Sequence, residues 1–439
     1  MRQLSAIQQI QLAYSYCKDI KNVYLFQSKS LESIRCYQLE QIKSIVKDAY
    51  EHVPYYRKKY KQAGINPYEI NSFDDFCRIP TISKQDVLGH EEEFIDERFQ
   101  KGDLIVSKTT GTSGQLLTLY LNPDLFITEE LQVIRMIKSV CPEYKCTDKE
   151  VLVYTSEYPV KSVLGFYKVY YVNNLRPYKE IFDLIKAKKP TVIAIYPTIL
   201  REVIRNIDFD FTKLGIKLII TNSEQSTQSQ RDEFEKAFGC MVIDEFSSEE
   251  NQSIAYQCKL KNYHEVPDCT YIELLNKGND YPVELGELGE ITGTCFLNKS
   301  MPLIRYRQGD LAERINSNCS CGCNFPIIGQ PLGRKNDSFK TKNGSIVPSG
   351  RILDWSYSLI LDHRIEIDGF QIIQESVDKI RFNVYSKNWH DNMSNTVKES
   401  FFDFYDDKSV TFEVCYTKNL PKIDPGKYRP IVSYVNTTN

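Results

Sequence analysis

The chain has 439 residues, more than one hydrophobic core usually serves, so we expect a large domain and at least one smaller one. It is 41% hydrophobic and 26% charged, with a net charge of -3, and so lacks the basic excess of a nucleic-acid-binding protein. No apolar run approaches the roughly 18 residues of a membrane span, and the polar N-terminal stretch does not resemble a signal peptide. We therefore expect a cytoplasmic protein with no nucleic-acid partner and no membrane span.

The first hundred residues show mainly helical spacing of apolar side chains. The stretch LEQIKSIVKDAYEHVPYYRKKYKQAG predicts helix that is interrupted at Pro54 and ends at Gly64. Next, SKTTGTSGQLLTLYL (107–121) places hydroxyl residues and two glycines before a strand-like run. The N–H groups of such a loop can hold phosphate oxygens, but the spacing lacks the Gly-Lys-Ser/Thr end of a P-loop, and a plain turn is the alternative.

From about residue 150, short apolar runs alternate with amphipathic stretches. The runs at 151–155, 191–197, 216–223 and 240–246 predict strands, and YKEIFDLIKAKK, TILREVIRNI and STQSQRDEFEKAFG predict the helices between them. This order implies right-handed crossovers and a mainly parallel sheet with helices on both faces. Ligands of such sheets bind where the strands end, so the loops after residues 197, 223 and 246 are the candidate positions.

The C-terminal part has a different pattern. Strands and turns prevail beyond residue 265, and after about residue 334 strand-like runs alternate with a helix near 393–406. This suits a small α+β domain of about one hundred residues. The predicted fold is α/β: a large N-terminal domain with mainly parallel sheets and flanking helices, plus a small α+β C-terminal domain.

Several segments occur in an order typical of one family. They include residues 49–87, TTGTSG (109–114), IDEFSSEE (243–250), MPLIRYRQGDLAE (301–313), GRKND (333–337) and LPKIDPGKYRPIVS (420–433). Together they resemble the adenylate-forming (acyl-activating, AMP-binding) superfamily, and within it the branch of phenylacetate-CoA ligases and the CapK-like proteins of capsule gene clusters. The resemblance implies an adenylation domain over residues 1–333 and a mobile C-terminal domain over 334–439.

The resemblance also implies an ATP site. Asp310 looks like the carboxylate that accepts both ribose hydroxyls, Arg334 would reach ribose or phosphate, and Phe246 would stack on adenine. Asn336 occupies the usual pivot position of the hinge. The other implied nucleotide contacts are Thr109, Thr110, Gly111, Thr112, Ser113, Gly114, Ser223 and Glu224.

The implied catalytic residues are Lys427, Glu250 and Thr112. Lys427 would neutralise charge developing between the substrate carboxylate and the α-phosphate, and Glu250 would ligate Mg²⁺. The chain departs from the family pattern at Gln115, which replaces a frequent lysine, and at Phe246, Ser247 and Glu249, which replace tyrosine, glycine and threonine. Lys108 is one candidate for the missing charge. Because a carboxylate repels phosphate, either Glu249 turns away or the phosphate contacts are altered.

Cysteine and histidine residues recur beyond residue 257. Cys258 and His264 are followed by Cys319-Ser320-Cys321-Gly322-Cys323, and thiolate and imidazole are ligands that Zn²⁺ takes four at a time. Related ligases carry a Cys-x-Cys-Gly turn here, so the resemblance favours Cys258, His264, Cys319 and Cys321 as the ligands of a structural zinc. Reduced cysteines in a loop are the alternative.

The predicted function is an ATP-dependent acid ligase that forms an acyl-adenylate, with Mg²⁺ and a structural Zn²⁺ and with homodimerisation left open. The acid, expected to be aryl or apolar, would bind near Tyr196, Pro197 and Thr198, with Asn222 and Phe246 as another wall. The C-terminal segment looks CapK-like, which favours an amine or hydroxyl of a surface-polysaccharide precursor as acyl acceptor. The alternatives are a phenylacetate-CoA ligase-like enzyme that uses CoA, a catalytically degenerate nucleotide-binding protein, and a zinc-stapled interaction module.

Overall fold

The computed structural model describes residues 4–109, 116–276, 278–316, 318–361, 365, 367–386, 389–417 and 429–435. The chain divides into two compact units. The first comprises Met1–Ser223, Phe238–Gln308 and Ala312–Gln330, and the second Glu224–Ala237, Gly309–Leu311 and Pro331–Asn439. None of the helices in the described part of the chain has the length and hydropathy that a bilayer crossing requires.

Three helices begin the first unit: α1 (Ala6–Phe26), α2 (Leu31–His52) and α3 (Pro54–Ala63). The hydroxyls of Ser5 and Ser30 cap the first two, because each accepts a backbone N–H of the first turn. Pro54 starts α3, where its missing N–H leaves no bond unmade, and Gly64 ends the helix at φ +67°. The predicted interruption at Pro54 and end at Gly64 are confirmed.

The largest sheet of the first unit has eight strands in the order β14-β10-β9-β8-β7-β6-β4-β5. Strands β5, β4, β6, β7 and β8 pair in parallel, and β8, β9, β10 and β14 pair antiparallel. Their bounds are β4 (Lys149–Tyr154), β5 (Lys168–Asn173), β6 (Val192–Ile195), β7 (Leu218–Thr221), β8 (Met241–Ser248), β9 (Gln252–Gln257), β10 (Tyr263–Glu265) and β14 (Ile327–Ile328). The four predicted strands are confirmed as β4, β6, β7 and β8, whereas β5 was not predicted.

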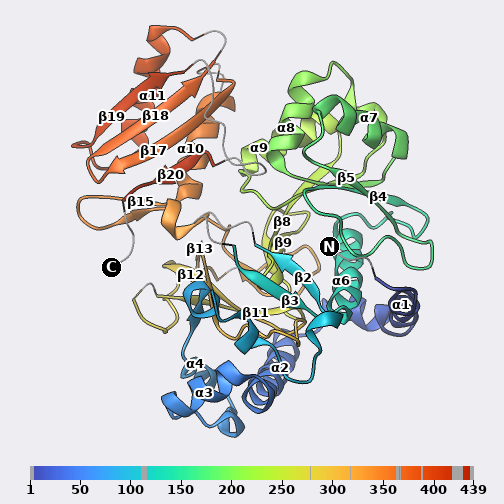
Figure 1. Cartoon of the computed structure of the whole chain (residues 1–439). Helices are drawn as coiled ribbons and strands as arrows, with labels where there is room; N and C mark the ends of the chain where they lie inside the picture. Colours follow the sequence, from blue (N-terminus) through green and yellow to red (C-terminus); the bar gives the residue numbers. More distant parts are fainter. Residues whose placement is uncertain are drawn as a thin grey trace. The chain divides into compact units, whose positions relative to one another are not determined.

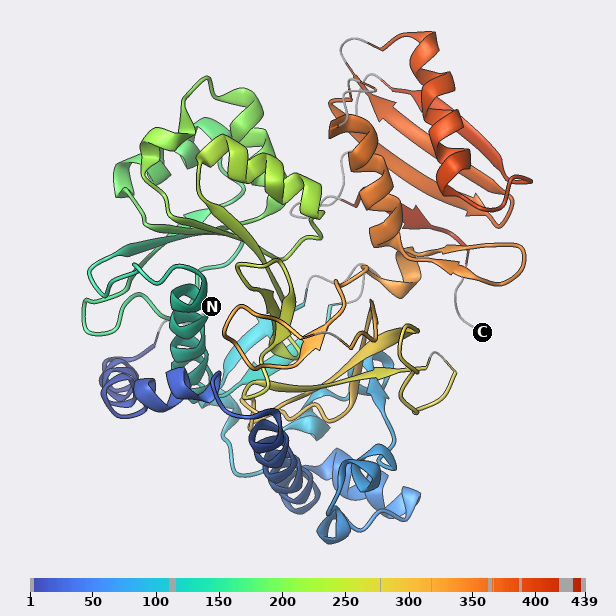
Figure 2. The same cartoon turned by 180° about the vertical axis from the view of Figure 1, so that it is seen from behind.

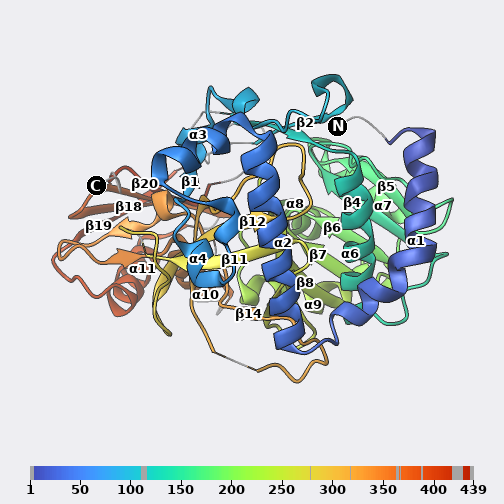
Figure 3. The same ribbon diagram turned by 90° about the horizontal axis from the view of Figure 1, so that it is seen from below.

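Helices cover both faces of the parallel strands. Helices α7 (Tyr178–Lys188) and α8 (Pro197–Asn206) lie on one side of β4 and β5, and α6 (Asp124–Val140) lies on the other side, next to α1 (Figure 1, Figure 3). The third predicted helix is α9 (Gln228–Phe238). Helix α6 was not predicted, because polar residues at buried positions, namely Glu130, Gln132 and Arg135, interrupt its apolar periodicity.

A second sheet of the first unit has the order β1-β13-β12-β11. The remaining elements of this unit are β1 (Ile82–Ser83), β2 (Ile105–Lys108), β3 (Thr118–Leu121), β11 (Thr270–Leu275), β12 (Leu288–Cys295), β13 (Tyr306–Glu313, partly in the second unit), α4 (Phe73–Cys77) and α5 (Lys84–Val87), with 3-10 turns at Pro67–Glu69, Glu91–Phe94, Lys101–Asp103 and Phe211–Leu214. A continuous cluster of buried apolar side chains joins the N-terminal helices, α6 and both sheets.

The second unit contains a four-stranded sheet in the order β19-β18-β17-β20, with α10 (Ser349–Leu361) and α11 (Asp391–Phe404) on the same face (Figure 2). Its strands are β17 (Gly369–Ser376), β18 (Lys379–Tyr385), β19 (Thr411–Tyr416) and β20 (Ile431–Ser433), and β15 (Phe339–Lys340) and β16 (Ile346–Val347) form a separate hairpin after a 3-10 turn at Lys335–Asp337. Trp355 of α10 stacks on Phe404 of α11, with ring centroids 5.6 Å apart. The predicted small α+β element is confirmed.

Candidate functional site

The parallel pairing of four strands of the eight-stranded sheet ends along one line. The register places Tyr154, Tyr196 and Asn222, at or directly after the ends of β4, β6 and β7, in one row with Glu245, where the parallel pairing of β8 stops. The Asn222 amide donates to the Tyr154 hydroxyl and, at 3.2 Å, to Glu245 Oε2, and the two tyrosine ring centroids are 5.8 Å apart. Tyr154 and Glu245 were not predicted, although a polar residue at the end of an apolar strand is a usable signal.

Glu129 of α6 and Tyr158 lie close to this row. The Tyr158 hydroxyl donates to Glu129 Oε2 at 2.8 Å. Burial raises the pKa of Glu129 to about 8; the Tyr158 bond lowers this pKa, and Glu245 and Glu249 raise it. Burial also raises the pKa of Glu245. The Glu129 carboxyl group therefore retains its proton at a pH where exposed glutamates are ionised, and so can donate as well as accept hydrogen bonds.

Thr109 closes the neck of the predicted phosphate loop between β2 and β3. Its N–H donates to the Leu117 carbonyl at 3.0 Å, and its hydroxyl accepts the Leu117 N–H at 3.2 Å. These two bonds hold the loop ends together in the extension of the hairpin. The other predicted contacts of this loop, namely Thr110, Gly111, Thr112, Ser113 and Gly114, lie outside the described residues, as does Gln115.

The turn between β8 and β9 carries the predicted magnesium ligand. Glu250 is half-buried, and its Oε1 accepts the Tyr306 hydroxyl at 3.2 Å. Its neighbour Glu249 accepts the Ser107 hydroxyl at 2.7 Å through Oε2. A fixed carboxylate oxygen of this kind suits a hard cation such as Mg²⁺.

The residues predicted to contact adenine occupy the strand ends. Ser223 directly follows Asn222 at φ +64°, and its hydroxyl lies 3.3 Å from Asn222 Oδ1. Phe246, half-buried, packs in the first unit against the apolar cluster that includes Ile254. Glu224 begins the second unit and is half-buried.

Asp310 and Arg334 are neighbours within the second unit. Arg334 Nε lies 3.2 Å from Asp310 Oδ1, and the two residues form an isolated antiparallel bridge. Glycine precedes each of them, with φ +86° at Gly309 and φ +81° at Gly333, a backbone conformation that side chains disfavour. The aspartate side chain is 10% exposed and the arginine side chain 43% exposed, so solvent reaches this pair through the guanidinium.

The predicted hinge segment also lies in the second unit. Asn336 is the middle residue of the 3-10 turn Lys335–Asp337, and Asp337 forms an ion pair with Arg429. Burial raises the pKa of Asp337, while Arg429 lowers it. The predicted catalytic residue Lys427 lies outside the described residues.

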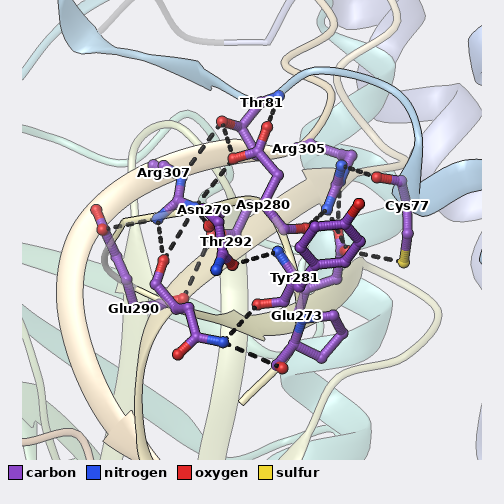
Figure 4. A network of polar contacts seen from close by, with 12 residues as sticks. Cys77, Thr81, Glu273, Asn279, Asp280, Tyr281, Glu290, Thr292, Arg305 and Arg307 are labelled. Carbon is purple, nitrogen blue, oxygen red and sulfur yellow. Dashed lines mark hydrogen bonds and ion pairs between the residues drawn. The ribbon is translucent and has the colours of Figure 1, made fainter.

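The two arginines of MPLIRYRQGDLAE belong to a polar network of the first unit (Figure 4). Arg305 donates to both carboxylate oxygens of Glu273 at 2.9 Å and to the Asp280 carbonyl at 2.9 Å. Arg307 forms ion pairs at 3.0 Å with Asp280 and with Glu290. These contacts fasten the start of β13 to β11, β12 and the loop between them, so we assign both arginines to the scaffold.

The four predicted zinc ligands come together in the first unit. Cys258 Sγ lies 3.6 Å from Cys319 Sγ, Cys321 Sγ lies 3.4 Å from His264 Nε2, and all four ligand atoms lie within 4.8 Å of one another. His264 Nδ1 is 3.0 Å from the Phe325 carbonyl, so Nδ1–H donates there and Nε2 is left to face the thiols.

Three N–H groups point at these sulfur atoms. The Leu260 N–H donates to Cys258 Sγ at 3.3 Å, the Asn262 amide to Cys319 Sγ at 3.3 Å, and the Cys323 N–H to Cys321 Sγ at 3.4 Å. Such donors favour thiolate, the form that binds metal. The donor set and its geometry therefore fit a tetrahedral zinc.

Known proteins share both sequence and fold with this chain, although no family model matches it. A phenylacetate-coenzyme A ligase of Thermus thermophilus is 23% identical over 332 residues, 72% of this chain and 74% of the relative. Protein CapK of Staphylococcus aureus is 23% identical over 392 residues, 80% of this chain and 79% of the relative. The crystal structure of 2-hydroxyisobutyryl-CoA ligase in the postadenylation state with 2-HIB-AMP is 18% identical, with a TM-score of 0.78 over 94% of this chain and 92% of that one.

The fold is therefore that of the CoA ligases, a large α/β unit followed by a small α+β unit. Together with this fold, the sequence relatives support the adenylate-forming superfamily of AMP-forming ligases, in the phenylacetate-CoA ligase-like branch.

Proposed function

We propose that this protein activates a carboxylic acid as an acyl-adenylate. The carboxylate of the acid attacks the α-phosphorus of ATP, the bond to pyrophosphate breaks, and the mixed anhydride keeps AMP as a good leaving group. An acceptor then displaces AMP by attack on the acyl carbon. The phenylacetate-CoA ligase relative, and a neighbour that holds an acyl-adenylate, support this reaction class.

The observation that carries the proposal is the Asp310–Arg334 pair. A nearly buried carboxylate has two acceptor oxygens for the two ribose hydroxyls, and a half-exposed guanidinium can turn toward a phosphate. Glu250 would hold Mg²⁺, which neutralises phosphate charge when bound. Lys427 would supply a positive charge at the α-phosphate.

For the acid we propose an aryl or apolar compound at the carboxyl ends of β6, β7 and β8. The Tyr154 and Tyr196 rings offer aromatic surface there, and the Asn222 amide and Tyr158 hydroxyl offer polar contacts for a substituent. For the acceptor we propose an amine or hydroxyl, such as that of a surface-polysaccharide precursor, which the CapK relative supports. The phenylacetate-CoA ligase relative supports CoA as the alternative.

Isotope exchange tests the first half-reaction. The protein is incubated with labelled pyrophosphate, ATP, Mg²⁺ and a panel of aryl, fatty and amino acids, and we expect label in ATP with at least one acid. Asp310→Ala and Lys427→Ala should abolish the exchange, whereas Asp378→Ala, an exposed aspartate of the same unit, should not. ATP binding without exchange across the panel contradicts the ligase and favours a nucleotide-binding protein. AMP release on adding CoA, amines or sugars then identifies the acceptor.

We further propose that Cys258, His264, Cys319 and Cys321 hold a structural zinc. The turn that carries two of them also packs on the N-terminal helices, because the Asn324 N–H donates to the Gln27 carbonyl at 2.8 Å and the Phe325 ring lies 5.8 Å from Phe26. A zinc at this point would tie the end of α1 to the eight-stranded sheet.

Metal analysis tests the zinc proposal. Protein purified without added metal should contain about one zinc per chain, and Cys319→Ser or Cys321→Ser should lose the metal together with several kcal/mol of stability, since binding free energy contributes to folding. Cys415→Ser, a half-buried cysteine of the second unit, is the matched control and should keep the zinc. Folded wild-type protein with almost no zinc contradicts the proposal.

A further inference from the structure

The turn between β8 and β9 is fastened to three other elements of the first unit, one of them β11, whose Thr270 hydroxyl donates to the Asn251 carbonyl at 2.5 Å. Glu250 accepts the Tyr306 hydroxyl of β13 at 3.2 Å, and the Asn251 amide donates to Gln308 Oε1, also of β13, at 2.9 Å. Its other side is held by Glu249, whose Oε2 accepts the Ser107 hydroxyl of β2 at 2.7 Å. Three successive residues of one turn thus reach β2, β11 and β13.

Ser107 is suited to hold a carboxylate. Its side chain is on the buried face of β2, like Thr109 two residues later, and it is only 6% exposed. Its hydroxyl donates one hydrogen bond, and the carboxyl oxygen of Glu249 is an acceptor for it at 2.7 Å. The bond is therefore expected to keep the Glu249 carboxylate at β2.

The same bond links two parts of the candidate nucleotide site. Ser107 precedes Thr109, which closes the neck of the predicted phosphate loop, and Glu249 precedes Glu250, the predicted magnesium ligand. Because Glu249 and Asn251 are both held by hydrogen bonds, the carboxylate of Glu250 between them has little freedom to move. Loss of the bond to β2 would leave this turn attached to β11 and β13 among the contacts described.

We infer that Glu249 is a positioning residue, which acts through Ser107 to hold Glu250 and the neck of the phosphate loop at a set distance. This inference rests on the proposed ATP site and deepens it. In this arrangement the Glu249 carboxylate turns toward Ser107, so it would not face and repel the phosphates of ATP. Its role depends on accepting a hydrogen bond and not on its negative charge.

Four variants test the inference through the apparent KM for MgATP in pyrophosphate exchange. Glu249→Ala and Ser107→Ala should each raise this KM about tenfold, the effect of losing one buried hydrogen bond, and the double variant should be no worse than either. Glu249→Gln keeps an acceptor oxygen and should stay within about twofold of the wild type. In all four, kcat at saturating MgATP should change less than KM.

Two results overturn the inference. Loss in Glu249→Gln equal to that in Glu249→Ala, with Ser107→Ala unaffected, shows that the charge itself binds metal or substrate. Wild-type KM in all variants shows that the contact positions nothing.

A second measurement separates this inference from the proposed function. Urea unfolding of the same variants reports the Ser107–Glu249 contact without any nucleotide, and non-additive losses in the double variant support it, whereas additive losses overturn it. Wild-type protein that binds no MgATP by calorimetry contradicts the proposed function, and the unfolding cycle then still decides whether Glu249 holds the turn through Ser107.

Discussion

Among the arginine–carboxylate pairs that involve the stretch 301–313, Arg305–Glu273 and Asp310–Arg334 differ in exposure. Arg305 and Glu273 are 0% and 3% exposed, whereas Asp310 and Arg334 are 10% and 43% exposed. Arg305 has its other donors on backbone carbonyls, so this pair has no capacity for a ligand. The Asp310–Arg334 pair reaches solvent through the guanidinium, and we propose that it exchanges its internal partner for a ribose or phosphate. Similar charges in one motif therefore serve the scaffold in one half and, in our proposal, binding in the other.

The largest expected effect tests the scaffold half. Arg305→Met leaves the Glu273 carboxylate buried without its partner, which should destabilise the protein by about 3–5 kcal/mol. Urea unfolding measures this loss. The double variant Glu273→Leu/Arg305→Met removes both charges and should lose less than the single variant; an equal loss would show that packing, and not the unpaired charge, is responsible.

The next effect tests the binding half. Asp310→Asn should reduce kcat/KM for ATP by about 10- to 100-fold, since one oxygen that accepts a ribose hydroxyl becomes a donor. Its free energy of unfolding should change by less than about 1 kcal/mol, because a half-exposed ion pair contributes little stability. Pyrophosphate exchange and urea unfolding of the same preparation decide between the roles. A large loss of stability with unchanged pyrophosphate exchange would show that Asp310 serves the scaffold and not nucleotide binding.

A smaller effect concerns the two glycines beside this pair. A Cβ at Gly309 would lie 3.8 Å from the Arg334 guanidinium, whereas a Cβ at Gly333 would lie only 2.3 Å from Ser349 Oγ and 2.5 Å from Gln225 Oε1. Both alanine variants adopt a disfavoured φ, at about 1–2 kcal/mol each, and Gly333→Ala also has to displace its neighbours. Thermal unfolding should therefore rank Gly333→Ala as the less stable; equal midpoints would mean that the neighbours move freely.

The last prediction concerns the pH dependence of stability that a buried carboxyl group, Glu150, causes. It contrasts with Glu273, which is also buried but forms an ion pair with Arg305. Burial and, to a smaller extent, the charge of Glu245 raise the pKa of Glu150 from 4.5 to about 8. The folded state then binds more protons than the unfolded state between these values, so stability falls as pH rises through this window. Glu150→Gln should flatten the slope of unfolding free energy against pH between 5 and 8, and the exposed Glu233→Gln should not. An unchanged slope in Glu150→Gln would mean that other groups set it.

Much of the architecture was accessible from the pattern of residues. Alternating apolar runs and amphipathic stretches predicted β4, β6, β7 and β8 with α7, α8 and α9, because helices and strands differ in their periodicity. The edge strand β5 was not predicted, although its Val-Tyr-Tyr-Val run favours a strand; only Val172 of its six residues is buried. Helix α6 was not predicted because its buried face includes charged residues.

The sequence by itself determined the order of the motifs and the strand ends predicted to border the site, because these depend on local spacing, and the resemblance to known ligases singled out the four candidate zinc ligands. Only the tertiary structure decided that Arg305 meets Glu273, that Asp310 meets Arg334 and that Glu249 meets Ser107. Each of these contacts joins residues separated by 24 or more positions along the chain, and no local rule specifies which distant partner a charged side chain will find when the sheets assemble.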